Sequence, residues 1–332
     1  MQPKFLNSKS QIYLVAPSFG CTTSPYKERL NKAIPRLEKF GHKVIVGKNC
    51  FLDLGICASN TPEARAKEFM EAYQSSAECI ISVGGGEMMT EILDYIDFDL
   101  IKTLKPKWFV GFSDNTHLTF TLATICDIAT IYGNCAGAFH FKKYTYDVKD
   151  TYAMLSGEKE FKGYPKYEAV PDKSDPFNNY NLDTKKVITA YNYQAPFSGT
   201  IIGGNLDCLQ LICGTKFDKM AAYSKAHTEG IIFYLEACDL SVLSIKRALI
   251  QLKRADWFNN IKGFLIGRPL CIDQELFGID HINACVDVLK EFNVPILLDI
   301  DLGHLAPSLP FKNNVYATVI FEKNNIFIKY KE

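Results

Sequence analysis

Several features that would assign a protein to a class are missing from this sequence. Lys+Arg and Asp+Glu number 37 each, so the formal net charge is zero and no overall field favours nucleic acid or an anionic membrane. Nowhere do eighteen apolar residues run together, and no apolar stretch of signal length precedes the first predicted strand, so neither a membrane span nor an export signal is indicated. The sequence therefore favours a small-molecule or peptide partner, and a homodimer stays open.

Motifs for metals, nucleotides and disulfides are also absent. The sequence has no H-E-x-x-H or clustered His/Cys spacing for a metal, and no G-K-[ST] phosphate loop. The eleven cysteines include no C-x-x-C pair, and many lie in apolar runs, which suits reduced thiols better than a disulfide framework. We therefore expect a cytoplasmic protein with no metal and no cofactor.

What the sequence does have is the composition of a globular enzyme. Hydrophobic residues make up 47% of the 332 residues and charged residues 22%, which is too apolar for disorder. The length exceeds the usual size of a single core, so two domains are expected. We predict an N-terminal domain over 1–150, a connecting segment over 151–195, and a C-terminal domain over 196–332.

Strand and helix patterns alternate along both predicted domains. In the first, compact apolar runs predict strands at 11–16, 43–46, 79–83 and 108–112. Helices are predicted at about 26–40, interrupted by Pro35, and after Thr61-Pro62. In the second, strands are predicted at 199–202, 230–236, 263–267 and 295–299, followed by a hairpin at 315–321 and 326–330. Such alternation is typical of an α/β fold with parallel strands, whose carboxyl ends carry the site.

The segment from about 132 to 193 interrupts this alternation. It is rich in glycine and proline and has no long apolar period, so we predict a connection with little regular structure. Its tyrosines, among them Tyr180, Tyr191 and Tyr193, could close over a ligand as a lid or simply bury themselves on the domain surface. Both interpretations stay open.

One stretch, residues 108–118, combines a buried strand with a polar cluster that begins a helix. Ser113 lies at this strand-to-helix turn, where its hydroxyl would be lifted clear of the sheet beside a helix N-terminus. A nucleophile needs this geometry. However, the second glycine of a G-x-S-x-G motif is missing, and an N-cap serine is the alternative.

Gly84-Gly85-Gly86 follows the predicted strand at 79–83, one strand before Ser113, so the two loops could be neighbours at the same sheet edge. Met89 breaks the G-x-G-x-x-G pattern of dinucleotide sites. Glycines here can instead let backbone N–H groups approach a ligand closely, as an oxyanion hole requires. The alternative is a tight turn without chemistry.

A glutamate and a histidine in the second half of the chain are candidates for acid–base chemistry. Glu236 ends a very apolar strand, where it must be solvated, paired or functional. His304 follows a strand and Gly303, a place where an imidazole can project into a cleft, although a surface or capping histidine is the common case. His117 is the rival base, but we expect no carboxylate to hold its tautomer.

Five short motifs, in order, carry a resemblance to a known family. They are Val83-Gly84-Gly85-Gly86, Gly111-Phe112-Ser113-Asp114, Ile202-Gly203-Gly204-Asn205-Leu206, Leu235-Glu236 and Leu302-Gly303-His304. Together they resemble the serine peptidase family of LD-carboxypeptidases and microcin C immunity proteins, over nearly the whole chain.

The resemblance implies a fold, a site and a reaction. The expected fold is α/β, with an N-terminal Rossmann-like parallel-sheet domain, a C-terminal α/β domain, and the active site between them. It implies a catalytic triad of Ser113, Glu236 and His304. The implied oxyanion hole is formed by the backbone N–H of Asp114 and that of Gly85 or Gly86. The implied activity is that of a serine protease of the carboxypeptidase type.

The resemblance leaves the substrate open. Cell-wall relatives cut a terminal D-alanine from muropeptides, whereas immunity-type relatives cleave an aminoacyl-nucleotide amide. The first group typically has arginine before its glycine pair; Val83 stands there in this chain, which favours the immunity type. Against that type, the only tryptophans, Trp108 and Trp257, lie outside the connecting segment, where one is expected to stack on substrate. A non-catalytic ligand-binding protein, or an acyltransferase or amidase using the same triad, remains as an alternative.

Overall fold

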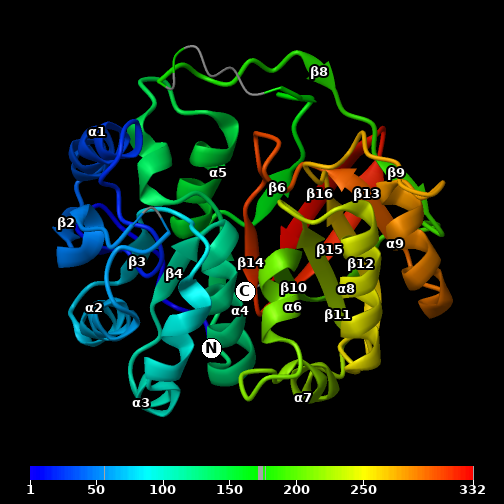
Figure 1. The fold of residues 1–332 in the computed structure, drawn as a ribbon, viewed down its shortest axis with the longest axis horizontal. Helices are drawn as coiled ribbons and strands as arrows, with labels where there is room; N and C mark the ends of the chain where they lie inside the picture. The colour runs from blue at the N-terminus through cyan, green and yellow to red at the C-terminus, as the bar shows by residue number, and fades with distance from the viewer. Residues whose placement is uncertain (56, 171–174, 176, 332) are drawn as a thin grey trace. The chain divides into compact units, whose positions relative to one another are not determined.

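The contacts of the chain divide it into two compact units, each described below by itself (Figure 1). The computed structural model describes residues 1–55, 57–170, 175 and 177–331. The first unit comprises Met1–Glu158, Asp172–Asn179 and Pro310–Lys312. The second comprises Lys159–Pro171, Tyr180–Leu309 and Asn313–Glu332.

The sheet of the first unit is a doubly wound parallel sheet. Its strands are β1 (Gln11–Val15), β2 (Lys43–Val46), β3 (Cys79–Ser82), β4 (Trp108–Gly111), β5 (Thr130–Tyr132) and β14 (Phe311–Asn313). They stand in the order β14-β5-β4-β3-β1-β2, and β1 to β5 pair in parallel. Since β1 lies between β2 and β3, the order of strands reverses there, and loops after neighbouring strands meet at one edge. The Rossmann-like expectation is confirmed.

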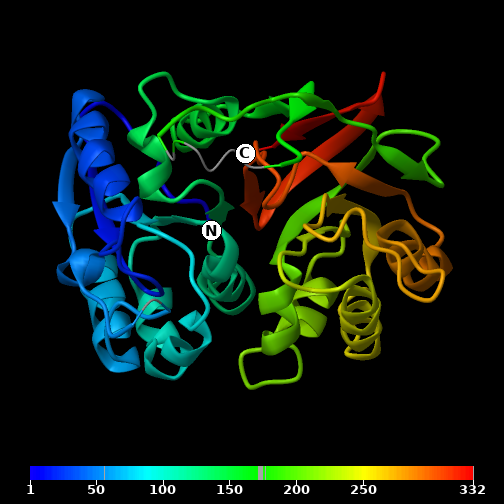
Figure 2. The same cartoon turned by 45° about the horizontal axis from the view of Figure 1, so that its top comes forward.

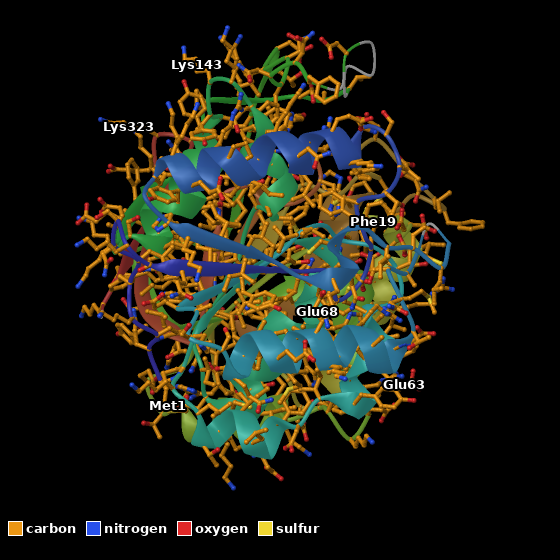
Figure 3. The ribbon with its side chains drawn as sticks, turned by 90° about the vertical axis from the view of Figure 1, so that its left-hand side faces the viewer. Met1, Phe19, Glu63, Glu68, Lys143 and Lys323 are labelled. Atoms are coloured by element: carbon orange, nitrogen blue, oxygen red, sulfur yellow. The ribbon has the colours of Figure 1, made fainter. Side chains whose placement is uncertain are left out.

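Helices cover both faces of this sheet. They are α1 (Tyr26–Lys39), α2 (Pro62–Gln74), α3 (Phe98–Thr103), α4 (Thr116–Cys126) and α5 (Tyr146–Leu155), with 3-10 turns η1 (Lys48–Phe51), η2 (Met89–Tyr95), η3 (Ser113–Asn115) and η4 (Ala136–His140). Figure 3 shows α1 and α2 on opposite sides of the strands. The contacts agree, because α1 packs against η4 whereas α2 packs against β1 and η2.

Local signals set the helix limits in two instructive cases. Thr61 caps α2, since its hydroxyl accepts a hydrogen bond from the Ala64 N–H at 3.3 Å and Pro62 occupies the first turn. The expected interruption of the first helix at Pro35 is wrong, because α1 continues through that residue to Lys39. Leu30, Ala33 and Leu37 are buried on one stripe of α1, so burial of this face outweighs the lost backbone hydrogen bond.

The sheet of the second unit is mixed. Its strands are β6 (Glu160–Lys162), β9 (Thr189–Tyr191), β10 (Phe197–Asn205), β11 (Ile231–Glu236), β12 (Ile261–Gly267), β13 (Ile296–Ile300), β15 (Val315–Glu322) and β16 (Asn325–Tyr330). They stand in the order β6-β16-β15-β10-β11-β12-β13-β9. The centre, β10 to β13, is parallel, and antiparallel strands flank it on both sides. The predicted hairpin is confirmed as β15 and β16.

Helices of the second unit connect its parallel strands. They are α6 (Leu206–Ile212), α7 (Met220–Ala226), α8 (Val242–Arg254) and α9 (His281–Leu289), followed by the 3-10 turn η5 (Lys290–Phe292). The middle helix, α8, packs against both α6 and α9. Figure 2 shows α8 (yellow) and α9 (orange) side by side. Within the part of the chain that the structure describes, every helix is too short or too polar to cross a bilayer.

The segment predicted as a connection is more regular than expected. Besides β6 and β9, which join the second sheet, it contains β7 (Lys166–Tyr167) paired with β8 (Thr184–Lys185). The division of the chain also differs from the predicted limits, since the first unit runs on to Glu158 and most of the segment belongs to the second unit. These strands are two or three residues long, too short to give a periodic signal. Residues 171–174 and 176 of the predicted connection lie outside the described residues.

A buried charge cluster fastens this segment to the loop that carries His304. Asp301 is fully buried, and its Oδ2 accepts hydrogen bonds from Lys186 Nζ at 2.6 Å and from the Tyr164 N–H at 2.7 Å. Its Oδ1 accepts one from Arg268 Nη2 at 2.8 Å. Because a buried carboxylate without donors would be very costly, these contacts fix both segments against each other.

We expect Lys186→Met to destabilise the second unit by about 3 kcal/mol, because it removes one cation from a buried carboxylate. The matched control is Lys246→Met, whose partner Asp287 is partly exposed, so the expected loss is under about 1 kcal/mol. Urea unfolding followed by tryptophan fluorescence in a Trp108→Phe background reports on the second unit through the buried Trp257. Equal losses for the two lysine variants would contradict the structural role of the cluster.

Candidate active site

Ser113 has a backbone conformation that side chains rarely adopt. It follows β4, its φ is +62°, and it opens the 3-10 turn η3 ahead of α4. Left-handed backbone at a residue with a Cβ stores strain and persists only where the surroundings hold it. The alternative of an N-cap serine is wrong, since the residue at the N-cap of α4 is Asn115.

The glycine loop lies against Ser113, as the sequence predicted for two neighbouring strands. A Cβ placed on Gly85 would lie 3.2 Å from Ser113 Cβ and 3.6 Å from its Oγ. At Gly86, where φ is +143°, a Cβ would come within 2.2 Å of Ser18 Oγ. Gly86 therefore requires glycine, both for its backbone conformation and for its close approach to Ser18, whereas an added Cβ at Gly85 would be tightly packed against Ser113.

Asn115 joins the serine turn to the glycine loop, a role that sequence reasoning missed. Its Nδ2 donates to the carbonyl oxygen of Gly84 at 2.9 Å and to that of Phe112 at 2.8 Å. The side chain folds back over β4, so a Cβ on Gly111 would collide with it at 2.5 Å. The glycine two residues before Ser113 was the available signal, because it marks a close approach.

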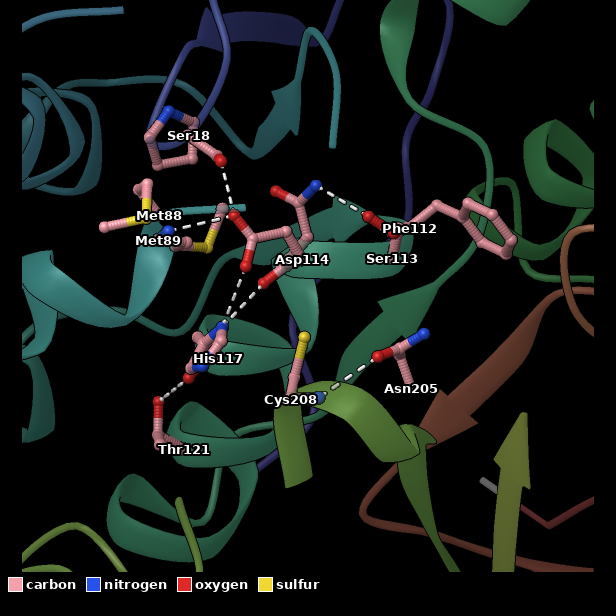
Figure 4. Close-up of polar contacts among 12 residues, drawn as sticks. Ser18, Met88, Met89, Phe112, Ser113, Asp114, His117, Thr121, Asn205 and Cys208 are labelled. Atoms are coloured by element: carbon pink, nitrogen blue, oxygen red, sulfur yellow. Dashed lines mark hydrogen bonds and ion pairs between the residues drawn. The ribbon is translucent and has the colours of Figure 1, made fainter. Parts of the chain in front are cut away.

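The structure corrects one expectation about His117. Its Nδ1 lies 3.1 Å from Asp114 Oδ1 and 3.0 Å from the Asp114 carbonyl oxygen, so a carboxylate does hold its tautomer (Figure 4). Sequence reasoning overlooked this partner three residues earlier on the same turn. The imidazole is completely buried, which suits a group that orients Asp114 better than a base that must meet substrate.

Glu236 is held by its neighbour in the second sheet. Asn205 and Glu236 end the parallel strands β10 and β11 and are direct register partners. Asn205 Nδ2 donates to Glu236 Oε1 at 2.9 Å, while Asn205 Oδ1 caps α6 by accepting from the Cys208 N–H at 3.1 Å. Glu236 is fully buried. Its position is therefore fixed by both the strand and the capping asparagine.

His304 pairs with this carboxylate, which is the partner that the family resemblance implies for it. Its Nδ1 donates to Glu236 Oε2 at 3.0 Å. Gly303, with φ of +114°, lets the loop pass close to the glutamate, since a Cβ there would lie 3.2 Å from Oε2. The thiol of Cys238 also hydrogen-bonds the imidazole. Although burial lowers the pKa of His304, the charge of Glu236 prevails and raises this pKa well above its usual value.

The tyrosines of the connecting segment occupy different places in the second unit. Tyr191 in β9 is the register partner of Ile296, at the amino end of β13. The Tyr193 hydroxyl accepts a hydrogen bond from the Phe321 N–H at 2.9 Å. This placement does not favour substrate contact by Tyr191 or Tyr193, because His304 follows the opposite end of β13.

Tyr180 lies in a segment that hydrogen bonds connect to the loop of His304. The next residue, Asn181, donates its N–H to Glu168 at 2.8 Å, and the Glu168 N–H donates to the Ala306 carbonyl oxygen at 2.8 Å. Ala306 follows His304 by two residues, so Tyr180 remains a candidate for substrate contact. Tyr167 joins it as a further candidate, because its ring stacks on Arg268 at 4.3 Å beyond the carboxyl end of β12.

The structure thus brings the predicted residues together in two sets. Ser113, Asp114 and the glycine loop are gathered in the first unit. Glu236 and His304 are gathered in the second, with Asn205 beside them. In each set the residues come from loops at the carboxyl ends of parallel strands, where α/β proteins place their sites.

Family profiles match both halves of the chain. Residues 12–133 match the LD-carboxypeptidase N-terminal domain, and residues 198–319 match the LD-carboxypeptidase C-terminal domain. The first match includes Ser113 and the glycine loop, and the second includes Asn205, Glu236 and His304.

Relatives and solved structures cover nearly the full chain. The microcin C7 self-immunity protein of Escherichia coli is 26% identical over 313 residues, 91% of this chain and 88% of that protein. The "Putative carboxypeptidase YocD" of Bacillus subtilis is 25% identical over 314 residues, 92% of each.

Three solved structures share the fold. An MccF-like protein from Bacillus anthracis has a TM-score of 0.84 at 23% identity, with 100% of both chains covered. The microcin C7 self-immunity protein in complex with aspartyl sulfamoyl adenosine has a TM-score of 0.83 at 23% identity, covering 100% of this chain and 99% of that one. A muramoyltetrapeptide carboxypeptidase from Oxalobacter formigenes has a TM-score of 0.73 at 19% identity, covering 97% and 99%.

The pairing of His304 with Glu236 can be tested by titration. We expect Glu236→Gln to lower the pKa of His304, because the carboxylate that stabilises the imidazolium is gone. NMR titration of the histidine ring signals, assigned with His304→Gln, measures this pKa. His281, which lies 3.0 Å from Asp299, is the internal control and should titrate unchanged.

The same pair makes folding stability depend on pH. A histidine whose pKa is raised in the folded state stabilises that state fully below its unfolded pKa and loses the contribution as pH rises through the folded pKa. The stability difference between wild type and Glu236→Gln should therefore shrink above that pH. An unchanged His304 pKa in the variant would contradict the pairing.

Proposed function

Because this chain belongs to the LD-carboxypeptidase family, we propose that it is a serine-type hydrolase that cleaves a C-terminal amide in a small modified peptide. Ser113 is the nucleophile, His304 the general base and acid, and Glu236 the group that orients the imidazole. The family match and the carboxypeptidase and microcin-immunity names of the relatives support this reaction class.

The observation that carries the proposal is the left-handed backbone of Ser113 at the carboxyl end of β4. A strained serine on a strand-to-helix turn is the arrangement that exposes a hydroxyl above a sheet in serine hydrolases. An N-cap role would require no such strain. The surrounding glycine loop and Asn115 keep the turn in this conformation.

The chemistry follows from the protonation of His304. Its Nδ1–H donates to Glu236, so the neutral imidazole keeps its lone pair on Nε2. Nε2 takes the Ser113 proton while Oγ attacks the amide carbon, and the resulting imidazolium is stabilised by Glu236. It then protonates the leaving amine as the C–N bond breaks. In the second step the same imidazole takes a proton from water as the water oxygen attacks the acyl carbon. The imidazolium then protonates Ser113 Oγ as the acyl group leaves.

The developing oxyanion needs backbone donors. The N–H of Asp114 lies immediately after the nucleophile, Gly85 lies against Ser113, and Gly86 approaches Ser18 more closely than a residue with a Cβ could. One N–H from each side therefore forms the oxyanion hole, and each donor is worth about 3 kcal/mol in comparable sites.

Two substrate classes fit this reaction. The aminoacyl-nucleotide class is favoured by Val83, which stands where cell-wall enzymes of the family are expected to have arginine. A solved relative was determined with aspartyl sulfamoyl adenosine, and another is a muramoyltetrapeptide carboxypeptidase. The muropeptide class is therefore the second candidate.

A substrate panel tests the reaction. Aminoacyl-sulfamoyl adenosine and muramoyl tetrapeptide are offered to wild type and Ser113→Ala, with products identified by mass. We expect one to be hydrolysed by wild type and its turnover to fall at least about 10⁴-fold in Ser113→Ala. Ser75→Ala, at the C-terminus of α2, is the matched control and should keep its rate.

Other outcomes of the panel would change the assignment. Full biological effect in Ser113→Ala would support a ligand-binding protein, and a product that incorporates an added amine would support an acyltransferase. His304→Ala should be as impaired as Ser113→Ala. Loss of activity in His117→Ala with normal activity in His304→Ala would contradict the choice of base.

The rate should also depend on pH through His304. Because Glu236 raises the pKa of this imidazole, the ring is protonated at low pH and cannot act as a base, so kcat/KM should rise with pH through that pKa. In Glu236→Gln the rise should move to lower pH while the maximal rate falls by about 10⁴-fold, as for other triads that lose their carboxylate. A rise at unchanged pH would assign it to another group.

A further inference from the structure

Loops after three strands of the first sheet meet at the carboxylate of Asp114. Its Oδ2 accepts a hydrogen bond from Ser18 Oγ, in the loop after β1, and from the Met89 N–H at 2.9 Å, beyond the glycine loop after β3 (Figure 4). Asp114 itself follows β4 and is only 2% exposed. The proposed mechanism uses only the backbone N–H of Asp114, as an oxyanion donor, and gives no role to its side chain.

The contacts of Asp114 are those of an ionised group. Burial alone would raise its pKa, but hydrogen bonds from His117, Ser18 and the Met89 N–H hold the pKa below its usual value. Hydrogen bonds to a charged acceptor are about twice as strong as neutral ones. The carboxylate therefore holds its donors firmly.

Two further hydrogen bonds fix the orientation of the glycine loop. Asn115 donates to the Gly84 carbonyl oxygen at 2.9 Å, and the Phe19 N–H donates to the Gly85 carbonyl oxygen at 3.1 Å. In a trans peptide the N–H points opposite to the C=O, so these bonds set the directions of the Gly85 and Gly86 N–H groups. One of these two N–H groups is the glycine-loop donor of the proposed oxyanion hole.

Ser18 connects Asp114 to the glycine loop, because it contacts both. Its Oγ lies where a Cβ on Gly86 would come within 2.2 Å, and the next residue, Phe19, donates to Gly85. Met89 continues the same loop on its far side. The carboxylate thus restrains the glycine loop through Ser18, which lies beside Gly86, and through Met89, three residues further along the chain.

We propose that the Asp114 side chain is a positioning residue that fixes the oxyanion-hole donors of the glycine loop relative to Ser113. This role rests on the proposed hydrolase function and adds a residue to it. The side chain does not touch substrate. It acts through Ser18 and Met89, and a shift of these donors by about 1 Å is enough to cost about 100-fold in rate.

The first unit offers a matched control for a buried carboxylate. Glu68 of α2, labelled in Figure 3, is 5% exposed and accepts hydrogen bonds from the Ala16 N–H at 2.9 Å and the Asn49 N–H at 2.6 Å. Neither donor belongs to the glycine loop. Neutralising Glu68 therefore perturbs the same unit without acting on the proposed oxyanion hole.

The test measures the rate at which a fluorophosphonate probe labels Ser113, since its phosphoryl oxygen must enter the oxyanion hole and no substrate need be known. We expect Asp114→Asn to slow labelling about 10- to 100-fold, and Glu68→Gln to stay within about twofold of wild type. Thermal unfolding of both variants, followed by circular dichroism, shows whether each is folded at the assay temperature. With substrate, Asp114→Asn should lower kcat and leave KM within about twofold.

A second variant keeps the test decisive if Asp114→Asn does not fold. Ser18→Ala removes one hydroxyl and leaves Asp114 with Met89 and His117, so we expect a smaller decrease in labelling rate, about threefold to tenfold. Wild-type labelling rates in both Asp114→Asn and Ser18→Ala, or an equal decrease in Glu68→Gln, would overturn the positioning role.

The outcome for the proposed function is read separately. Ser113→Ala should not be labelled. Failure of wild type to be labelled at Ser113, together with normal turnover by Ser113→Ala, would overturn the hydrolase mechanism and with it the role of Asp114. Labelling of wild type with an unaffected Asp114→Asn would overturn only the positioning role.

Discussion

A carboxylate buried at the end of a strand must be given hydrogen-bond donors, and both units are organised around this requirement. Asp114 gathers Ser18, Met89 and His117 in the first unit. Glu236 gathers Asn205 and His304 in the second. An unpaired buried charge would cost several kcal/mol, so the loops that supply these donors are confined to one arrangement.

The two carboxylates have different consequences because their donors differ. Glu236 accepts a hydrogen bond from the imidazole of His304, and its negative charge raises the pKa of that imidazole, which makes His304 a stronger base. Asp114 also accepts from a buried imidazole, that of His117, but its other two donors, a hydroxyl and a backbone N–H, belong to the loops around the glycine turn, so its charge holds these loops in place. The first arrangement suits proton transfer and the second suits preorganised stabilisation of charge.

Membership of the LD-carboxypeptidase family narrows the reaction but not the substrate. Proteins with the same fold include a microcin C7 self-immunity protein and a muramoyltetrapeptide carboxypeptidase, and identities of 19–26% do not separate these groups. We propose that side chains around the site determine which substrate is cleaved. Within the second unit, Tyr167 and Tyr180 are better placed for such a role than Tyr191 and Tyr193, because their segment is attached to the loop of His304.

Much of the fold followed from local patterns. The apolar runs that end in Ser82 and Glu236 became buried strands, and Thr61-Pro62 opened a helix, since hydrophobic period and capping act within a few residues. The predicted interruption at Pro35 was wrong because the burial of a whole helix face outweighed one missing hydrogen bond. The short strands of the connecting segment were missed because pairing with distant strands, not local sequence, defines them.

The candidate site divides in the same way. Local patterns were enough to place Ser113, Glu236 and the glycines at the ends of predicted strands and His304 in the loop after one. The carboxylate partner of His117 lies only three residues earlier, within reach of local reasoning. The left-handed backbone of Ser113, in contrast, was visible only in the folded structure. The fold also decided which donors reach Asp114 and Glu236, because these contacts join Ser18 to Asp114 across 96 positions and Glu236 to His304 across 68. Contacts over such separations depend on the order of strands in a sheet, which local sequence does not encode.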